Sequence, residues 1–147
     1  MKFWEEQGKI KVAAPAKINL FLEILGKRQD GYHEIETVMQ EVSLFDYLYI
    51  ENYDKGVEFT CSNPKLATDE ENLVVKAVRL MQKETGISKG VKIHLEKKIP
   101  IGAGLGGGSS DAVATLFGLN RLWQIGYDEK QLMSLSGKLC SDTPFFV

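Results

Sequence analysis

Apolar and polar side chains alternate along the first part of the chain, and a period of two predicts β-strands. The extended segments are predicted at residues 9–14, 18–25, 34–42, 46–52 and 57–61. The first of them is expected to end at Pro15, and the Gln-Asp-Gly sequence at 29–31 predicts a turn. Together these segments predict a largely antiparallel run of strands.

The period then changes to a helical spacing of three to four residues. Thr68 and Glu71 have the spacing of a capping box, which predicts the start of a helix that ends at Gly86. Alternation returns over 91–97 and predicts a half-buried strand, with His94 on its polar face. This strand leads directly into a glycine-rich segment.

Two more helices are predicted after the glycine-rich segment. The first has a buried stripe formed by Ala112, Leu116, Leu119 and Trp123. Gly118 lowers the helix propensity there, so we expect close packing at that position. The second begins at Asp128, and residues 145–147 look like the start of a further strand. Strands followed by mixed strands and helices predict an α+β fold, with a mostly antiparallel sheet and helices on one face.

The glycine-rich segment is the strongest chemical signal in the chain. Five glycines lie between Gly102 and Gly108, after a strand and at the start of a helix. Glycine permits positive φ and close approach of a ligand, and a helix N-terminus offers unpaired N–H groups and partial positive charge. The segment therefore predicts an anion-binding loop, most naturally for phosphate, with the hydroxyls of Ser109 and Ser110 beside it.

Two other phosphate motifs fit this segment poorly. The P-loop requires Gly-Lys-Ser/Thr at its end, whereas this loop ends in Gly-Ser-Ser-Asp. A dinucleotide fingerprint can be drawn through Gly102, Gly104 and Gly107, but it requires a strand after the helix, and a further helix is predicted there. A flexible linker is the plainest alternative, and the regular elements on both sides argue against it.

Composition narrows the class of protein. The 147 residues are 44% hydrophobic and 26% charged, which is typical of one soluble globular domain. The net charge is −2 and there is no long basic run, which argues against nucleic acid and membrane surfaces as partners. The two cysteines, Cys61 and Cys140, show no pair spacing and predict reduced thiols in a cytoplasmic protein.

The loop and several shorter segments resemble one kinase superfamily. Residues 100–110 follow the pattern Pro-x-Gly-x-Gly-Leu-Gly-Ser/Gly-Ser-Ser of the GHMP kinases, which include galactokinase, homoserine kinase, mevalonate kinase and phosphomevalonate kinase. Segments 14–22, 28–33, 71–73 and 142–146 narrow the resemblance to the branch that phosphorylates a cytidine diphosphate derivative in the non-mevalonate isoprenoid route. Motifs in several separate places, in order, are more specific than the loop alone.

The resemblance implies a set of ATP-binding residues. In the loop these are Pro100, Ile101, Gly102, Ala103, Gly104, Leu105, Gly106, Gly107, Gly108, Ser109 and Ser110. Asn72 and Leu73 match positions that border the adenine, and Lys97 matches a residue near it. The superfamily uses Mg²⁺ with ATP, mostly through the phosphates, so no protein ligand for the metal is named.

The resemblance also implies the groups that act on the acceptor. Asp142 matches the catalytic aspartate that takes the proton from the acceptor hydroxyl, and Lys17 matches the lysine beside it. Asn19 lies two residues further on the same strand face, as a plausible partner of Lys17. Tyr32 and His33 match a pair that contacts the cytosine of the substrate.

The residues alone leave plainer interpretations open. Ser-Asp-Thr-Pro around Asp142 is also a good turn sequence, and most lysines are simply solvated. Tyr32 at a hairpin end is also explained by packing on the core. Cys140 and Thr143 stand where the superfamily more often has glycine and an aliphatic residue, so the local match around Asp142 is incomplete.

For the whole chain, the resemblance implies a fold like domain 2 of ribosomal protein S5, with a left-handed β-α-β unit. Residues 1–147 would be the N-terminal, ATP-binding domain of a cytoplasmic small-molecule kinase, without the C-terminal domain that closes the cleft. An exposed seam would then favour self-association. Three alternatives remain: another kinase of the superfamily, an S5-like RNA-binding module, and a fragment that binds nucleotide without turnover.

Overall fold

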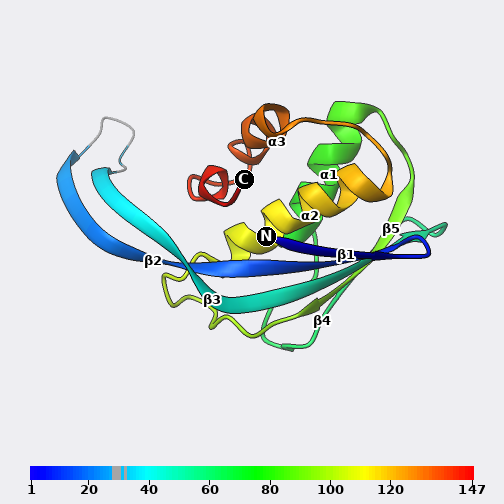
Figure 1. The fold of residues 1–147 in the computed structure, drawn as a ribbon, viewed down its shortest axis with the longest axis horizontal. Helices are drawn as coiled ribbons and strands as arrows, with labels where there is room; N and C mark the ends of the chain where they lie inside the picture. Colours follow the sequence, from blue (N-terminus) through cyan, green and yellow to red (C-terminus); the bar gives the residue numbers. More distant parts are fainter. Residues whose placement is uncertain (28–30, 32) are drawn as a thin grey trace.

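The computed structural model describes residues 1–27, 31 and 33–147. It contains one mixed sheet with the strand order β1-β2-β3-β5-β4. The strands are β1 (Lys2–Glu6), β2 (Lys9–Lys27), β3 (His33–Tyr53), β4 (Val57–Cys61) and β5 (Gly90–Glu96). The helices are α1 (Leu73–Thr85), α2 (Gly107–Leu122), α3 (Glu129–Ser136) and the 3₁₀-helix η1 (Thr143–Phe146). All helices lie on one face of the sheet (Figure 1), as the α+β prediction requires.

The sheet is antiparallel except at one edge. β1 pairs with β2, β2 with β3, and β3 with β5 in antiparallel register. β4 and β5 are parallel, so α1 is the crossover of a β-α-β unit. The largely antiparallel prediction is therefore confirmed, and the handedness of the crossover stays a prediction.

The hydrophobic core lies between the inner face of the sheet and the helices α1 and α2. Alternate positions of the central strands and one stripe of each helix are almost completely buried: Val12, Leu48, Ile50, Ile93, Leu95, Val78, Met81, Leu116 and Leu119. The predicted stripe of the second helix is confirmed. At Gly118 a Cβ atom would overlap the Ile50 Cδ1 atom, so the expected close packing is also confirmed. α2 can lie this close to β3 because that side chain is missing.

Two pairs of predicted strands are continuous in the structure. β2 runs straight through Pro15, and β3 joins the segments predicted at 34–42 and 46–52. The register shifts here, because Pro15 lies opposite Phe45 while Ala16 lies opposite Val42. A bulge of this kind leaves ladder positions unpaired and therefore tolerates a proline inside a strand. The prediction that the strand ends at Pro15 was wrong for this reason.

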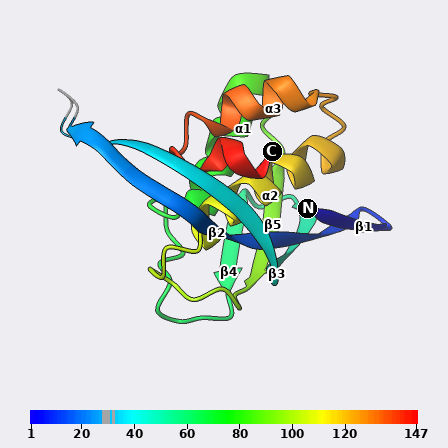
Figure 2. The ribbon, with the colours of Figure 1, turned by 60° about the vertical axis from the view of Figure 1, so that its left-hand side comes forward.

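Beyond the bulge, β2 and β3 form an arm that projects past the helical layer (Figures 1 and 2). We define the apolar arm by its exposed hydrophobic side chains: Ile18, Leu20, Phe21, Leu22, Ile24, Leu25 and Val38. The strand prediction for 18–25 is confirmed, but the expected alternation does not bury these residues. The predicted turn at 29–31 lies mostly outside the described residues.

Three local predictions need correction. The N-cap of α1 is Asn72, whose Oδ1 accepts the N–H of Val74 at 2.9 Å, so the capping box from Thr68 is wrong. Glu71 instead pairs with Lys76 at 2.9 Å. Residues 145–147 do not begin a strand, because Pro144 lies in the first turn of η1 and favours a helical backbone. β1, which pairs along β2, was not foreseen.

The remaining helix ends follow the predictions. Gly86 caps α1 in the left-handed conformation, with φ of 70°. Asp128 and Gln131 form a capping box at the start of α3. Among the described residues, no helix is both long enough and apolar enough to span a membrane.

Gly90 is the first residue of β5, next to the edge strand β4, and its packing can be tested by substitution. A Cβ atom on Gly90 would overlap the carbonyl oxygens of Tyr53 and Gly56, which are backbone atoms that cannot rotate away. We expect Gly90→Ala to lower the free energy of unfolding by about 1–3 kcal/mol, measured by urea denaturation. Gly26→Ala is the matched control, since a Cβ there meets nothing within 4 Å. Equal stability of the two variants would contradict this packing.

Candidate functional site

The glycine loop connects β5 to α2 and has an alternating backbone conformation. Gly102, Gly104 and Gly106 have φ of 71°, 73° and 68°, in the left-handed region that other residues rarely adopt. A Cβ on Gly102 or Gly104 would meet nothing within 4 Å, so these positions require glycine for its backbone conformation rather than for space. Gly106 is the N-cap of α2 and has no side chain to cap the helix. The first intrahelical bond runs from the Ser110 N–H to the Gly106 carbonyl, at 2.9 Å.

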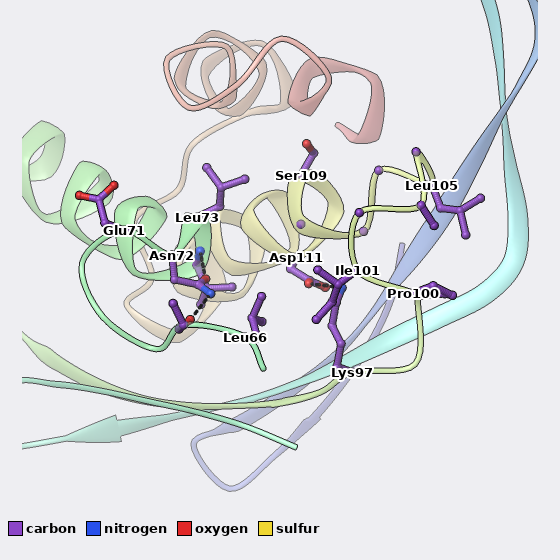
Figure 3. Close-up of a pocket in the computed structure, with 18 residues that line it drawn as sticks. Leu66, Glu71, Asn72, Leu73, Lys97, Pro100, Ile101, Leu105, Ser109 and Asp111 are labelled. Atoms are coloured by element: carbon purple, nitrogen blue, oxygen red, sulfur yellow. Dashed lines mark hydrogen bonds and ion pairs between the residues drawn. The ribbon is translucent and has the colours of Figure 1, made fainter. Parts of the chain in front are cut away.

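A cavity of about 420 Å³ opens between this loop and the N-terminus of α1 (Figure 3). Its lining combines the loop from Pro100 to Ser109, the start of α1, Lys97, Asp111 and the apolar side chain of Leu66. The first residues of α2 line the cavity, and the N–H groups that precede the first helical bond have no intrahelical acceptor. Together with the helix dipole, they make this end of the cavity suited to an anion.

A cluster of buried charged residues holds the start of the glycine loop against the sheet. Asp46 of β3 is completely buried and accepts the backbone N–H groups of Lys98 and Ile99, at 2.5 and 2.8 Å. The same carboxylate binds the Lys97 ammonium, which also contacts Asp111 Oδ2 at 2.9 Å. We call Asp46, Lys97 and Asp111 the buried cluster. It connects the sheet, the start of the loop and α2.

The protonation of the buried cluster follows from burial and from its own charges. Burial opposes the charge on Lys97, but the carboxylates of Asp111 and Asp46 outweigh it and raise the pKa of Lys97. Burial raises the pKa of Asp111 to about 8, although Lys97 acts in the opposite direction. Asp46 adds to the increase, because two carboxylates share one ammonium.

A second group of polar residues lies on the other side of the loop. The Lys17 side chain is 6% exposed, and its Nζ lies 3.8 Å from Asp142 Oδ2 and 3.2 Å from Asn19 Oδ1. The backbone N–H of Lys17 donates to the Leu105 carbonyl at 2.9 Å, which fixes β2 to the loop. Asp142, at 40% side-chain exposure, remains open to a ligand.

Gly106 connects the two groups. A Cβ on Gly106 would lie 2.9 Å from Lys17 Cγ and 2.9 Å from Phe146 Cζ. The bend between loop and helix is therefore packed directly against the lysine and against the segment that carries Asp142. A ligand phosphate in the loop and an acceptor beside Asp142 would lie on adjoining surfaces of this one turn.

The structure brings most of the predicted residues together. Every predicted loop residue except Ser110 lines the cavity, and so do Asn72, Leu73 and Lys97. Ser110 is completely buried in α2, and its Oγ has no partner among the described residues. His94 is exposed as expected and lies 2.9 Å from Thr60. Tyr32 lies outside the described residues, and His33 is described as the first residue of β3.

Sequence reasoning missed two members of the buried cluster as site residues. Asp46 was assigned to the strand predicted at 46–52. Asp111 was expected in the first turn of the helix, where the resemblance allows Asn or Asp and assigns no metal ligand; this placement was wrong, because α2 begins at Gly107 and Asp111 is its fifth residue. The available signal for Asp46 was a carboxylate between the apolar residues Phe45 and Tyr47, since a buried charge requires partners. Cys140, which departs from the superfamily pattern, places its Sγ 3.4 Å from Ser109 Oγ.

Comparison with known proteins gives a family model and named relatives. The model of the GHMP kinases N terminal domain matches residues 72–147. A 4-diphosphocytidyl-2-C-methyl-D-erythritol kinase of Prochlorococcus marinus (strain MIT 9215) is 50% identical over 142 residues, which cover 95% of this chain and 45% of the relative. A protein of the same name from Synechococcus sp. (strain JA-2-3B'a(2-13)) is 49% identical over 134 residues, covering 91% and 43%. The chain thus spans less than half the length of these relatives.

Solved structures agree with the sequence matches. A crystal structure of 4-(cytidine 5'-diphospho)-2C-methyl-D-erythritol kinase aligns with a TM-score of 0.78 and 43% identity, covering 92% of this chain and 48% of that one. The homoserine kinase of Cytophaga hutchinsonii aligns with a TM-score of 0.69 at 24% identity, covering 94% and 42%. The second likeness shows the fold alone.

The buried cluster predicts a large effect of a single substitution. Asp46→Ala leaves the Lys97 ammonium short of a partner and removes the acceptor of two backbone N–H groups. We expect the free energy of unfolding to fall by about 3–5 kcal/mol, because breaking a buried ion pair leaves an uncompensated charge. Urea denaturation measures this change.

Glu70→Gln is the matched control, because the Glu70–Arg79 pair at 2.7 Å is exposed. Exposed pairs contribute about 0–1 kcal/mol, so this variant should lose little stability. If Asp46→Ala were no less stable than Glu70→Gln, the buried cluster would not have the structural role described here.

Proposed function

The chain belongs to the GHMP kinase family, and on this premise we propose that it is the N-terminal, ATP-binding part of a 4-diphosphocytidyl-2-C-methyl-D-erythritol kinase. The reaction proposed is transfer of the γ-phosphoryl group of ATP to the 2-hydroxyl of 4-diphosphocytidyl-2-C-methyl-D-erythritol. Such a protein is a cytoplasmic phosphotransferase of the non-mevalonate isoprenoid route. The substrate assignment is supported by the names of relatives that are about half identical to this chain over 95% of its length.

One structural observation carries the proposal: the glycine loop separates a cavity suited to an anion from the Lys17–Asp142 pair by a single turn at Gly106. Phosphoryl transfer depends mainly on positioning and on stabilising charge at the transferred group. The cavity would hold the phosphoryl donor, and the Lys17–Asp142 pair would act on the acceptor. We call these two parts of the site the donor end and the acceptor end.

The donor end is proposed to hold ATP. The loop from Pro100 to Ser110 and the N-terminus of α2 would receive the triphosphate, with N–H groups directed at the charge that develops on the transferred phosphoryl. Asn72 and Leu73, at the start of α1, would border the adenine, with Lys97 near it. Mg²⁺ would enter with ATP and be held mostly by its phosphates. Among the described residues there is no group of three or more His, Cys, Asp and Glu side chains placed to hold a metal.

The acceptor end is proposed to hold the hydroxyl. Asp142 accepts the hydroxyl proton as the oxygen attacks the γ-phosphorus, the bond to the β-phosphate oxygen breaks, and ADP leaves. The Lys17 ammonium, held by Asn19, lies beside this carboxylate and can bind the attacking oxygen or a phosphoryl oxygen. Tyr32 and His33 are proposed to contact the cytosine of the acceptor.

Relatives are more than twice as long as this chain, and we propose that their second half closes the cleft over both ligands. In the structure described here, Asp142 is partly exposed and the apolar arm is uncovered, so the acceptor end is open to solvent. This observation favours a second candidate function: binding of nucleotide without turnover. The nucleotide affinity of these 147 residues should in that case be weaker than that of the longer relatives, because closure excludes water from the site.

Asp142→Asn tests the proposed reaction. With ATP, Mg²⁺ and 4-diphosphocytidyl-2-C-methyl-D-erythritol, we expect ADP formation by the unaltered chain and a loss of about 10²–10⁴-fold in the variant, as for other general bases. Binding of ADP should be unchanged, because Asp142 lies outside the cavity. Asp54→Asn, in an exposed turn, is the matched control.

The outcomes of this assay separate the candidates. ADP release that depends on mevalonate or homoserine in place of the cytidine compound would identify another kinase of the family. ADP binding without ADP release would support the second candidate function. Full activity of Asp142→Asn would contradict the role proposed for this residue.

The apolar arm predicts self-association. Its exposed side chains form a hydrophobic surface of the kind that monomeric proteins seldom leave uncovered. We expect a concentration-dependent increase in mass by light scattering, and its loss in a variant with Leu20→Glu and Leu22→Glu. Met133→Glu, at an exposed apolar residue of α3, is the control and should still associate. A monomer at high concentration would contradict the prediction.

A further inference from the structure

The buried cluster contains two carboxylates and one ammonium, and the two carboxylates accept different numbers of hydrogen bonds. Asp46 accepts three donors, namely the Lys97 ammonium and the N–H groups of Lys98 and Ile99. Asp111 accepts the Lys97 ammonium through Oδ2, whereas its Oδ1 has no partner within the described part of the chain. Both side chains are almost fully buried. One negative charge of the cluster is therefore left without compensation when both carboxylates are ionised.

A proton on Asp111 removes this excess charge. Its Oδ2 can accept from Lys97 whether or not Oδ1 carries a proton, so the neutral acid keeps the contact that the structure shows. Asp46 already accepts three donors, so the carboxyl oxygen that is free to carry the proton, among the described residues, is Oδ1 of Asp111. Burial raises the pKa of Asp111 to about 8, which agrees with this distribution of charge.

Charged groups on the elements around α2 are paired elsewhere or exposed to solvent. Lys17 of β2 contacts Asp142, and Glu71 before α1 pairs with Lys76. Glu129 and Lys130 of α3 are exposed. The protonation of Asp111 therefore depends on its burial and on the other two members of the buried cluster, Lys97 after β5 and Asp46 of β3.

Asp111 also lines the cavity, as the fifth residue of α2, the helix whose N-terminus is proposed to receive phosphate. We propose that Asp111 is a proton-bearing binding group of this cavity, and that an anionic nucleotide binds with uptake of one proton at this residue. The inference rests on the proposed nucleotide site. Phosphate charges close to an ionised, buried carboxylate would be repelled, whereas a neutral acid removes the repulsion and supplies an O–H donor.

The sign of the pH dependence follows directly. Nucleotide-bound protein holds the proton more tightly than free protein, so affinity is constant while Asp111 is protonated in both states. Above the pKa of Asp111 in the free protein, this carboxyl group is ionised and must take up a proton when the nucleotide binds. The affinity therefore decreases with rising pH. For a single linked proton the limiting decrease is about tenfold per pH unit.

Calorimetric titration with Mg²⁺ and ADP tests this inference. We propose measurements at about pH 7, 8.5 and 9.5, each in two buffers of different ionisation enthalpy, so that the number of protons taken up is obtained directly. The unaltered chain should take up few protons at the lowest pH and close to one at the highest, with about a tenfold loss of affinity over the last pH unit. Asp111→Asn, which mimics the neutral acid, should bind with a flat pH profile and no proton uptake. Asp54→Asn should behave as the unaltered chain.

Three results would overturn the inference while leaving the proposed function in place. The first is ADP binding by the unaltered chain without proton uptake. The second is equal proton uptake by Asp111→Asn. A ¹³C titration of the Asp111 carboxyl carbon in the free protein needs no variant and should show a midpoint near 8. A midpoint near that of an exposed aspartate would overturn it as well. Failure of the unaltered chain to bind ADP at any pH would contradict both this inference and the proposed nucleotide site.

Discussion

The carboxylate of Asp46 joins the parts of this protein that must stay in register. It belongs to a central strand, yet its hydrogen bonds go to the segment that leaves β5 and to the Lys97 ammonium that contacts α2. Without this carboxylate, the backbone N–H groups of Lys98 and Ile99 would lack their hydrogen-bond acceptor at the point where the sheet ends. The direction in which the chain enters the glycine loop therefore depends on one charged side chain.

The conformation of the loop in turn depends on glycine at three positions. Gly102 and Gly104 allow the backbone to turn, and Gly106 allows α2 to begin directly against Lys17 and Phe146. A side chain at Gly106 would separate the helix N-terminus from the lysine by roughly the width of a methyl group. The close approach of the α2 N-terminus to the Lys17–Asp142 pair is thus a steric result of a missing Cβ atom.

Sequence patterns predicted the elements that have strong local signals. The glycine loop, the buried stripe of α2 and the cap of α3 follow from composition and spacing within one element. The continuity of β2 through Pro15 could not be predicted in this way, because it depends on a bulge in the partner strand. Asp46 was missed for a similar reason: its donors lie more than fifty residues away in the sequence. Resemblance to known kinases named Lys17 and Asp142, and the structure places them 3.8 Å apart.

Stability alone does not explain a buried cluster with more carboxylates than ammonium groups. Apolar residues of similar volume often match or exceed the stability of a buried ion pair. They would, however, leave the N–H groups of Lys98 and Ile99 without an acceptor, and they would make no distinction among alternative positions of the loop. Oδ2 of Asp111 joins α2 to Lys97, whereas Oδ1 has no partner among the described residues and adds nothing to this structural role. We therefore propose that this second, buried carboxyl oxygen serves the ligand that enters the cavity.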